Sequence, residues 1–230
     1  MTSPRFYVIA QIDGADGSMA KWKERLVPLC AVSRTEAHGS SYYWGQDLDG
    51  APDSLWGLEG YTHAVGFFLG HPSSDIFQRE MALIDQDRLL RTVQGSNSPD
   101  YHLHHYDQEG GWLKRPDDAE RDSKTSHVVV LHYWAKPGSR RRLLQRLVDF
   151  AEAEEKRSST VQSCLVLREL LDFDMATLWL RTKDAEGWKS LQASEGYKTL
   201  QADLNHDIIV RTEVHQSQSF NGHLEKEKDI

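Results

Sequence analysis

The sequence is poor in the features that mark several large classes of protein. It holds two cysteines among 230 residues, Cys30 and Cys164, and their separation matches no metal-binding spacing. We therefore expect two buried free thiols in a reducing, cytoplasmic compartment. No apolar run approaches the roughly 18 residues that a membrane helix needs. Residues 1–5 are not followed by the apolar core of a signal peptide.

The sequence also lacks an excess of positive charge, since 35 acidic residues outnumber 27 basic ones. The net charge is −8, and the longest basic run is the triplet Arg140–Arg142. This balance argues against nucleic acid and anionic membranes as main partners. The triplet opens a predicted helix, where it forms either a solvated helix face or a contact for an anion. The chain also lacks a nucleotide-binding glycine loop and the motifs GxSxG, CxxC and HExxH. We expect neither an organic cofactor nor a bound metal.

What the sequence does contain is a faint internal repeat. Residues 173–200 read as a strand, a charged turn and two short helices, and residues 62–83 carry a weaker version of the same pattern. Aligning Phe77 with Trp188 gives an offset of 111 (188 − 77). A long repeat that occurs twice indicates a duplicated domain. We predict domains at 1–107 and 126–215, a linker at 108–125 and a disordered tail at 216–230.

The predicted order of elements in each half is β-α-β-β-α-β. The first half has expected strands at 6–12, 40–46, 61–69 and 101–106, and helices at 19–33 and 75–92, with 47–60 as a loop. The second half has expected strands at 126–135, 161–169, 173–181 and 207–215, and helices at 140–156 and 184–204. This is the ferredoxin-like arrangement of the α+β class, with helices on one face of an antiparallel sheet. The other face needs a partner, so we predict two tandem domains packed sheet to sheet as a pseudo-dimeric α+β barrel. The outer helices could still pair in a homodimer.

Two segments carry a resemblance to a known family. They are YWAKPGSRRRLLQRL from Tyr133 and LWLRTKDAEGWKSLQASEGYKTL from Leu178. Together with EAHGSSYYWGQD from Glu36, they resemble the antibiotic biosynthesis monooxygenase-like (ABM) domain of the dimeric α+β barrel superfamily. Leu191 stands where many members have a histidine, so the haem-degrading activity of one branch is not expected. The resemblance implies cofactor-independent oxygenation of an aromatic or polyketide-derived substrate in secondary metabolism.

Such chemistry needs a base, a cavity for a flat ring and stabilisation of an enolate-like anion. Histidine is the natural base because its pKa lies near neutrality. Our candidate catalytic residues are His63 on the third predicted strand, His102 and His104 on one face of the fourth, and Tyr43. The candidate substrate-binding residues share large aromatic or imidazole rings on predicted strands or in the long loop: Trp44, Trp56, Phe67, Tyr106, His132 and Trp134.

Several alternatives remain open at this point. The same histidine base would serve a polyketide cyclase or isomerase that uses no O2. Each histidine could instead be a surface or core residue, and the aromatic rings could simply fill the core. His102, His104 and His63 could ligate a metal, although no acidic or cysteine partner has the expected spacing. A duplicated barrel could also be a non-catalytic binding or stress-response module. We expect the first half to hold the working pocket and the second to be mainly scaffold.

Overall fold

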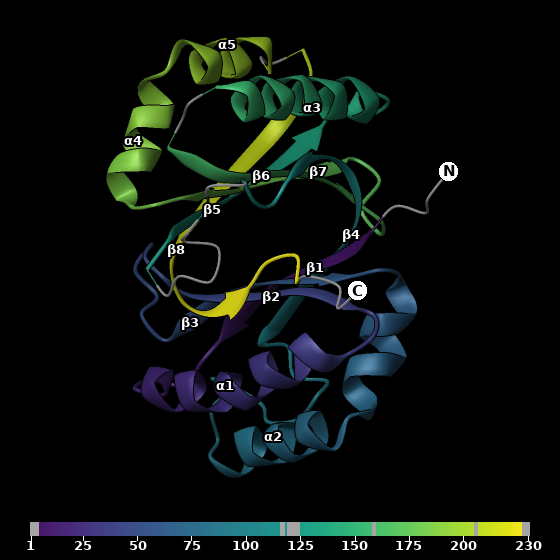
Figure 1. The fold of residues 1–230 in the computed structure, drawn as a ribbon, viewed down its shortest axis with the longest axis vertical. Helices are drawn as coiled ribbons and strands as arrows, with labels where there is room; N and C mark the ends of the chain where they lie inside the picture. Colours follow the sequence, from purple (N-terminus) through teal and green to yellow (C-terminus); the bar gives the residue numbers. More distant parts are fainter. Residues whose placement is uncertain (1–4, 116–117, 119–124, 158–159, 205–206, 227–230) are drawn as a thin grey trace. The chain divides into compact units, whose positions relative to one another are not determined.

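The computed structural model describes residues 5–115, 118, 125–157, 160–204 and 207–226, and it has α+β architecture (Figure 1). The chain divides into two compact units. Of the described residues, unit 1 contains 5–104 and 217–226, and unit 2 contains the others. Among these residues, no helix combines the length and the apolar character needed to cross a membrane.

Unit 1 is a sheet with helices on one face (Figure 1). Its own strands are β1 (Phe6–Asp13), β2 (Gly39–Asp47) and β3 (Ser54–Tyr61), and its helices are α1 (Met19–Thr35) and α2 (Asp75–Gln86). A short π-helix, η1 (Gly66–Gly70), runs directly into a 3-10 turn, η2 (His71–Ser73). The β3 strand lies between β1 and β2, antiparallel to both.

Unit 2 repeats this arrangement. Its strands are β5 (His127–Ala135), β6 (Val161–Glu169) and β7 (Met175–Thr182), with β7 antiparallel to both neighbours. Helices α3 (Arg140–Lys156), α4 (Ala185–Ala193) and α5 (Glu195–Asp203) cover one face of this sheet (Figure 1). Leu143, Leu147 and Phe150 of α3 are buried against it, as their helical spacing predicts.

Each sheet is completed by part of a long strand that begins in the other unit. Tyr106–Trp112 of β4 (Tyr101–Trp112) pairs with β6 in unit 2, and Ser217–His223 of β8 (Ile209–His223) pairs with β2 in unit 1. The predicted linker is therefore wrong over residues 108–112, and the predicted disordered tail is wrong over 216–223. Residues 116–117, 119–124 and 227–230 of these two segments lie outside the described part of the chain.

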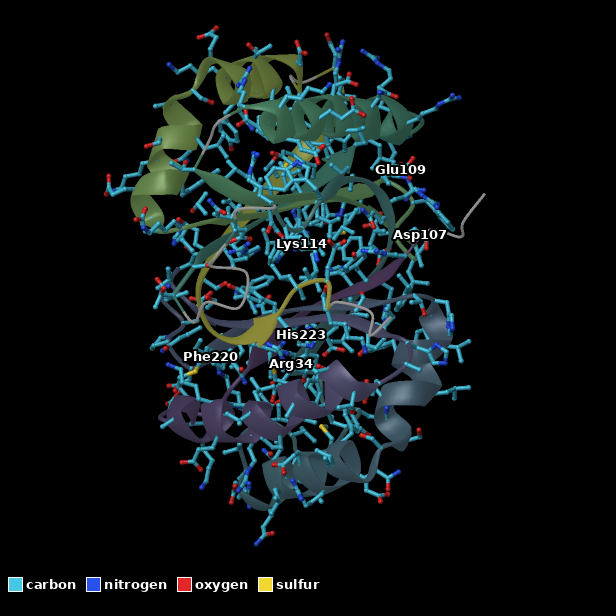
Figure 2. The ribbon with its side chains drawn as sticks, in the orientation of Figure 1. Arg34, Asp107, Glu109, Lys114, Phe220 and His223 are labelled. Atoms are coloured by element: carbon cyan, nitrogen blue, oxygen red, sulfur yellow. The ribbon has the colours of Figure 1, made fainter. Side chains whose placement is uncertain are left out.

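Polar side chains hold these strand ends in place, although their polarity suggested disorder. On β8, His223 Nε2 lies 2.8 Å from Ser33 Oγ, and Arg34 donates to the carbonyl of Gly222 (Figure 2). Phe220 lies beneath the ammonium of Lys23. On β4, Asp107 and Glu109 both bind Arg168 of β6. A polar segment can thus be ordered when specific partners satisfy it.

The register of the two sheets corrects the alignment of the repeat. Phe6 pairs with Tyr61 in unit 1 and His127 pairs with Thr182 in unit 2, so equivalent residues are 121 apart (182 − 61 and 127 − 6). Ser74 caps the amide of Phe77 just as Ser194 caps that of Tyr197, so Phe77 matches Tyr197 and the separation here is 120 (197 − 77), one less than in the strands. The alignment of Phe77 with Trp188 is wrong. It followed from placing the third strand at 61–69, whereas β3 occupies 54–61.

Candidate functional site

Unit 1 contains a cavity of about 220 Å³ between the helix-facing side of its sheet and helices α1 and α2. Aromatic rings dominate its lining: Trp22, Tyr42, Trp44, Phe67, Phe68, Phe77 and Tyr101. Two ionisable side chains, Glu59 and His71, join them. An engineered cavity of about 150 Å³ holds benzene, so this cavity has room for a larger, flat, mostly apolar molecule.

A glycine opposite a tryptophan shapes the sheet side of the cavity. Trp44 on β2 pairs with Gly57 on β3. A Cβ atom on residue 57 would lie 2.7 Å from three atoms of the Trp44 ring, which is too close for any side chain. Glycine in a strand often marks such a close approach. Here it lets the indole ring lie across the neighbouring strand while both residues stay in the sheet.

His71 is the best-placed base in this cavity. It is 2% exposed and begins the 3-10 turn directly after the π-helix, an element frequent at functional sites. Its Nδ1 lies 2.7 Å from Oε1 of Glu36, the residue that ends α1. Because a carboxylate only accepts hydrogen bonds, the neutral imidazole paired with it carries its proton on Nδ1 and leaves Nε2 as an acceptor. Nε2 is buried and has no hydrogen-bond partner among the described residues.

Neighbouring rings fix the plane of the imidazole. The ring of Tyr42 lies 5.6 Å from that of His71, and the ring of Phe77 packs edge-on at 4.9 Å. Burial lowers the pKa of His71, but the hydrogen bond with Glu36 and the negative charges that Glu59 and Glu36 carry when ionised outweigh it. The net effect raises this pKa above its ordinary value of 6.5. A carboxylate, an oriented histidine and an unpartnered Nε2 form the arrangement of a general base.

Glu59 is the second ionisable group of the cavity. It projects from β3 opposite Tyr42 of β2 and is 8% exposed. Its Oε2 accepts a hydrogen bond of 2.7 Å from the hydroxyl of Tyr61. Burial raises the pKa of Glu59 above its ordinary value of 4.5, and the favourable effects of His71 and Tyr61 offset this only in part. Burial likewise raises the pKa of Tyr42 and keeps its hydroxyl protonated.

The histidines selected from the sequence lie elsewhere. His63 follows β3 in a bend, so its predicted place on a strand is wrong, and it is exposed beside the ring of His38 at 4.4 Å. His102 is about half exposed and contacts Asp13 at 3.2 Å. His104 is half-buried on β4. None of the three lines the cavity. Within the described part of the chain, no group of three His, Cys, Asp or Glu side chains is arranged to hold a metal ion.

The selected aromatic residues divide between the two faces of the sheets. Trp44 and Phe67 line the cavity. Side chains alternate along a strand, and the other selected residues point away from the helices of their own unit: Tyr43, Trp56, Tyr106, His132 and Trp134.

These residues, which point away from the helices of their own unit, have ordinary hydrogen-bond partners. Tyr43 donates to Ser219, Trp56 to Asp47 and Trp134 to Asp172. His132 Nδ1 lies 2.8 Å from Thr177 Oγ1, and Thr177 in turn bonds Tyr106. The site roles predicted for them stay predictions.

Sequence reasoning missed the central group of Glu36, Glu59 and His71. Glu59 fell in a segment read as a loop, and His71 in a turn. With the repeat aligned at 121 positions, Glu59 would have matched Leu180 of an apolar strand. A carboxylate in place of a core leucine is the signal that could have revealed it.

Comparisons with known proteins agree with the fold. No protein-family model matches the chain, and no curated protein matches it. Among solved structures, a "putative monooxygenase" from Fusobacterium nucleatum is similar with a TM-score of 0.82 and 11% identity, covering 100% of this chain and 99% of its own. A "putative monooxygenase" from Lactobacillus acidophilus has a TM-score of 0.78 and 8% identity over 96% and 97%. An "anthrone oxidase-like protein" has a TM-score of 0.66 and 10% identity over 98% and 95%. At these identities the likeness shows the fold alone.

Proposed function

We propose that this protein is a cofactor-independent monooxygenase and that the cavity of unit 1 is its active site. One observation carries the proposal: His71 is buried in the lining of an aromatic cavity, is oriented by Glu36 through Nδ1, and has an Nε2 that no described residue bonds. The names of the similar structures, two monooxygenases and an anthrone oxidase-like protein, agree with this assignment. The substrate is an electron-rich aromatic ketone or phenol, polyketide-derived in the context of secondary metabolism.

The proposed reaction begins with proton transfer. His71 Nε2 accepts a proton from the acidic C–H or O–H of the bound substrate, and Glu36 stabilises the imidazolium that forms. The resulting carbanion or enolate gives electrons to O2 and forms a peroxide. The peroxide takes the proton back from His71 and eliminates water. For a methylene group next to aromatic rings, the methylene and one molecule of O2 give a carbonyl group and one molecule of water. One oxygen atom thus enters the product and the other leaves with the two methylene hydrogens.

The apolar lining supports this sequence of steps. Rings of Trp22, Trp44 and Phe77 can stack on a flat substrate and exclude water from the reactive carbanion. General-base catalysis contributes typically about 10²–10⁴-fold to a rate, which is what His71 has to supply. We also propose that the two units pack as the pseudo-dimeric barrel predicted from the sequence.

The test is O2 uptake by the purified, metal-stripped protein with hydroxylated naphthalenes and anthrones, without added NAD(P)H. We expect one O2 consumed per ketone formed, and one atom of 18O2 in each product molecule. Conversion of substrate without O2 uptake would replace the monooxygenase with a cyclase or isomerase. Ligand binding without any conversion would make the unit a binding module.

A further inference from the structure

The cavity lining contains a carboxyl group, Glu59, that has no part in the pair of His71 and Glu36. Glu59 is held between its strand neighbours Val8 of β1 and Tyr42 of β2, and it faces the helices with Trp44 and Leu55. Tyr61 donates to one oxygen, Oε2, and no other hydrogen bond of Glu59 is formed by the described residues. The other oxygen is therefore available to a bound molecule.

We propose that Glu59, as a neutral carboxylic acid, donates a hydrogen bond to a carbonyl oxygen of the substrate and so selects aromatic ketones over anionic ligands. This inference rests on the proposed function, because it names Glu59 as the group that binds the substrate oxygen that becomes negative when His71 removes a proton. His71 gains the proton, the substrate oxygen gains the charge, and Glu59 keeps its proton while its hydrogen bond strengthens. No oxidant other than the O2 of the proposed reaction is involved.

The groups around Glu59 favour its neutral form. Tyr42 pairs with it from β2, Tyr61 lies on its own strand, and His71 and Glu36 lie beyond. No lysine or arginine lines the cavity, within the described residues. Burial and the second carboxylate, Glu36, both raise the pKa of Glu59, against the opposing effects of His71 and Tyr61. A carboxylic acid kept neutral by its surroundings can donate to an oxyanion.

The absence of a lining cation also bears on the choice of ligand. An anionic ligand would enter a cavity lined by the carboxyl group of Glu59 and by the imidazole of His71, which binds a second carboxyl group, Glu36, through Nδ1. A carboxylate or phosphate ligand would lose its water and find no cationic partner but the His71 imidazole, which is already paired with Glu36, and this is costly. A neutral ketone loses little and gains the hydrogen bond from Glu59.

The test is binding of 1-tetralone, a neutral bicyclic aromatic ketone, measured by isothermal titration calorimetry from pH 5 to pH 9. This probe has a carbonyl acceptor and no acidic hydroxyl, and binding needs no O2. We expect affinity to be highest at low pH and to fall about tenfold or more as Glu59 ionises and loses its donor. The anion 1-naphthoate should bind at least about tenfold more weakly than 1-tetralone throughout.

Two variants isolate the donor. In Glu59→Gln the amide oxygen can still accept from Tyr61 and the amide N–H can donate at every pH, so affinity should become nearly independent of pH. In Glu59→Leu, which introduces the residue found at the matching position of unit 2, affinity should be low at every pH. Glu80→Gln removes the charge of a buried carboxyl that does not line the cavity, and it should retain the wild-type profile.

Several results would overturn the inference. If Glu59→Gln keeps the wild-type pH dependence, the donor that titrates is His71. Failure of 1-tetralone to bind, or equal binding of 1-naphthoate, would show that Glu59 does not select a carbonyl. These results are independent of O2 uptake. The protein could bind ketones as inferred and yet consume no O2, in which case the proposed function alone would fail.

Discussion

The two units place different residues at matching positions of the same sheet. On the helix-facing side of unit 1, β2 and β3 bring together Tyr42 with Glu59 and Trp44 with Gly57. On the same side of unit 2, β6 and β7 bring together Cys164 with Leu180 and Val166 with Leu178. All four residues of unit 2 have no exposed surface and belong to a continuous apolar core.

The difference shows how one arrangement of strands serves two purposes. In unit 2, side chains of medium size fill the space under the helices, as close packing requires. In unit 1, a large ring opposite a glycine and a carboxyl in place of a leucine leave space and polarity where a core would be. Loss of packing at a functional site is usually compensated elsewhere in the molecule, and unit 2 is a candidate for that role.

Removing the base should have the largest effect. We expect His71→Asn to lower the rate of O2 uptake by about 10²–10⁴-fold, because the Asn amide can replace Nδ1 as the donor to Glu36 but has no counterpart of Nε2. The matched control is His63→Asn, which changes an exposed histidine of the same unit and should leave the rate unchanged. If the rate of O2 uptake falls equally in the two variants, or falls only in His63→Asn, the base is His63, as expected from the sequence, and His71 does not act alone.

Moving the carboxyl into the other unit should have the next largest effect. Leu180→Glu buries a carboxyl group between Val129 and Cys164, without the tyrosine and histidine that surround Glu59. A pKa raised by about 3 units costs about 4 kcal/mol of unfolding free energy at neutral pH. The reverse change, Glu59→Leu, should be neutral or stabilising by about 1–3 kcal/mol. Urea unfolding at pH 7 measures the free energy of unfolding of both variants. If the two substitutions destabilise the protein similarly, the carboxyl of Glu59 does not lower the stability of unit 1.

Exchanging the glycine and tryptophan pair should have a smaller effect. Gly57→Ala places a methyl group 2.7 Å from the Trp44 ring, and overpacking of this kind costs about 1–3 kcal/mol. The double variant Gly57→Leu with Trp44→Val, which copies Leu178 and Val166 of unit 2, should unfold at higher urea concentration than Gly57→Ala. It should also lose affinity for 1-tetralone. If the double variant still binds the ketone, the Trp44 ring does not shape the binding space.

The sequence predicted the parts of this structure that depend on local pattern. Helix α3 was placed at its observed ends, and helix α1 begins at Met19 as expected. The α+β class is confirmed. These elements have regular apolar spacing or strong turn signals, so neighbouring residues in the chain determine them. The structure contains a cavity in unit 1, the half in which we expect the working pocket, and its role stays a prediction.

The parts that could not be predicted depend on contacts between distant residues. Strand β3 contains Gly57 and Gly60, which weaken its strand signal, yet both glycines are there because rings of Trp44 and Tyr7 pack over them. Misplacing that strand shifted the repeat by ten positions and put His63 on a strand. His71 acquires its role only when the turn after η1 meets the end of α1 at Glu36, and no local pattern encodes that meeting.

The smallest predicted effect is a dependence of stability on pH that belongs to unit 1. The pKa of His71 and the pKa of Glu59 are both raised in the folded protein. A group with a raised folded pKa binds its proton more tightly when folded, so its contribution is full below the unfolded pKa and is lost as pH rises through the folded one. The loss should therefore begin above about pH 4.5 for Glu59 and above about pH 6.5 for His71, with both slopes negative.

We therefore expect the contribution of these two groups to the unfolding free energy to fall between pH 5 and pH 9. The variant His71→Asn with Glu59→Gln should remove most of this slope, and His63→Asn should not change it. Urea unfolding across the pH range measures the difference between the variants, in which titrations elsewhere in the chain cancel. A slope that survives the double substitution would place the pH-sensitive groups outside the cavity, and the contrast between the two units would then be one of packing alone.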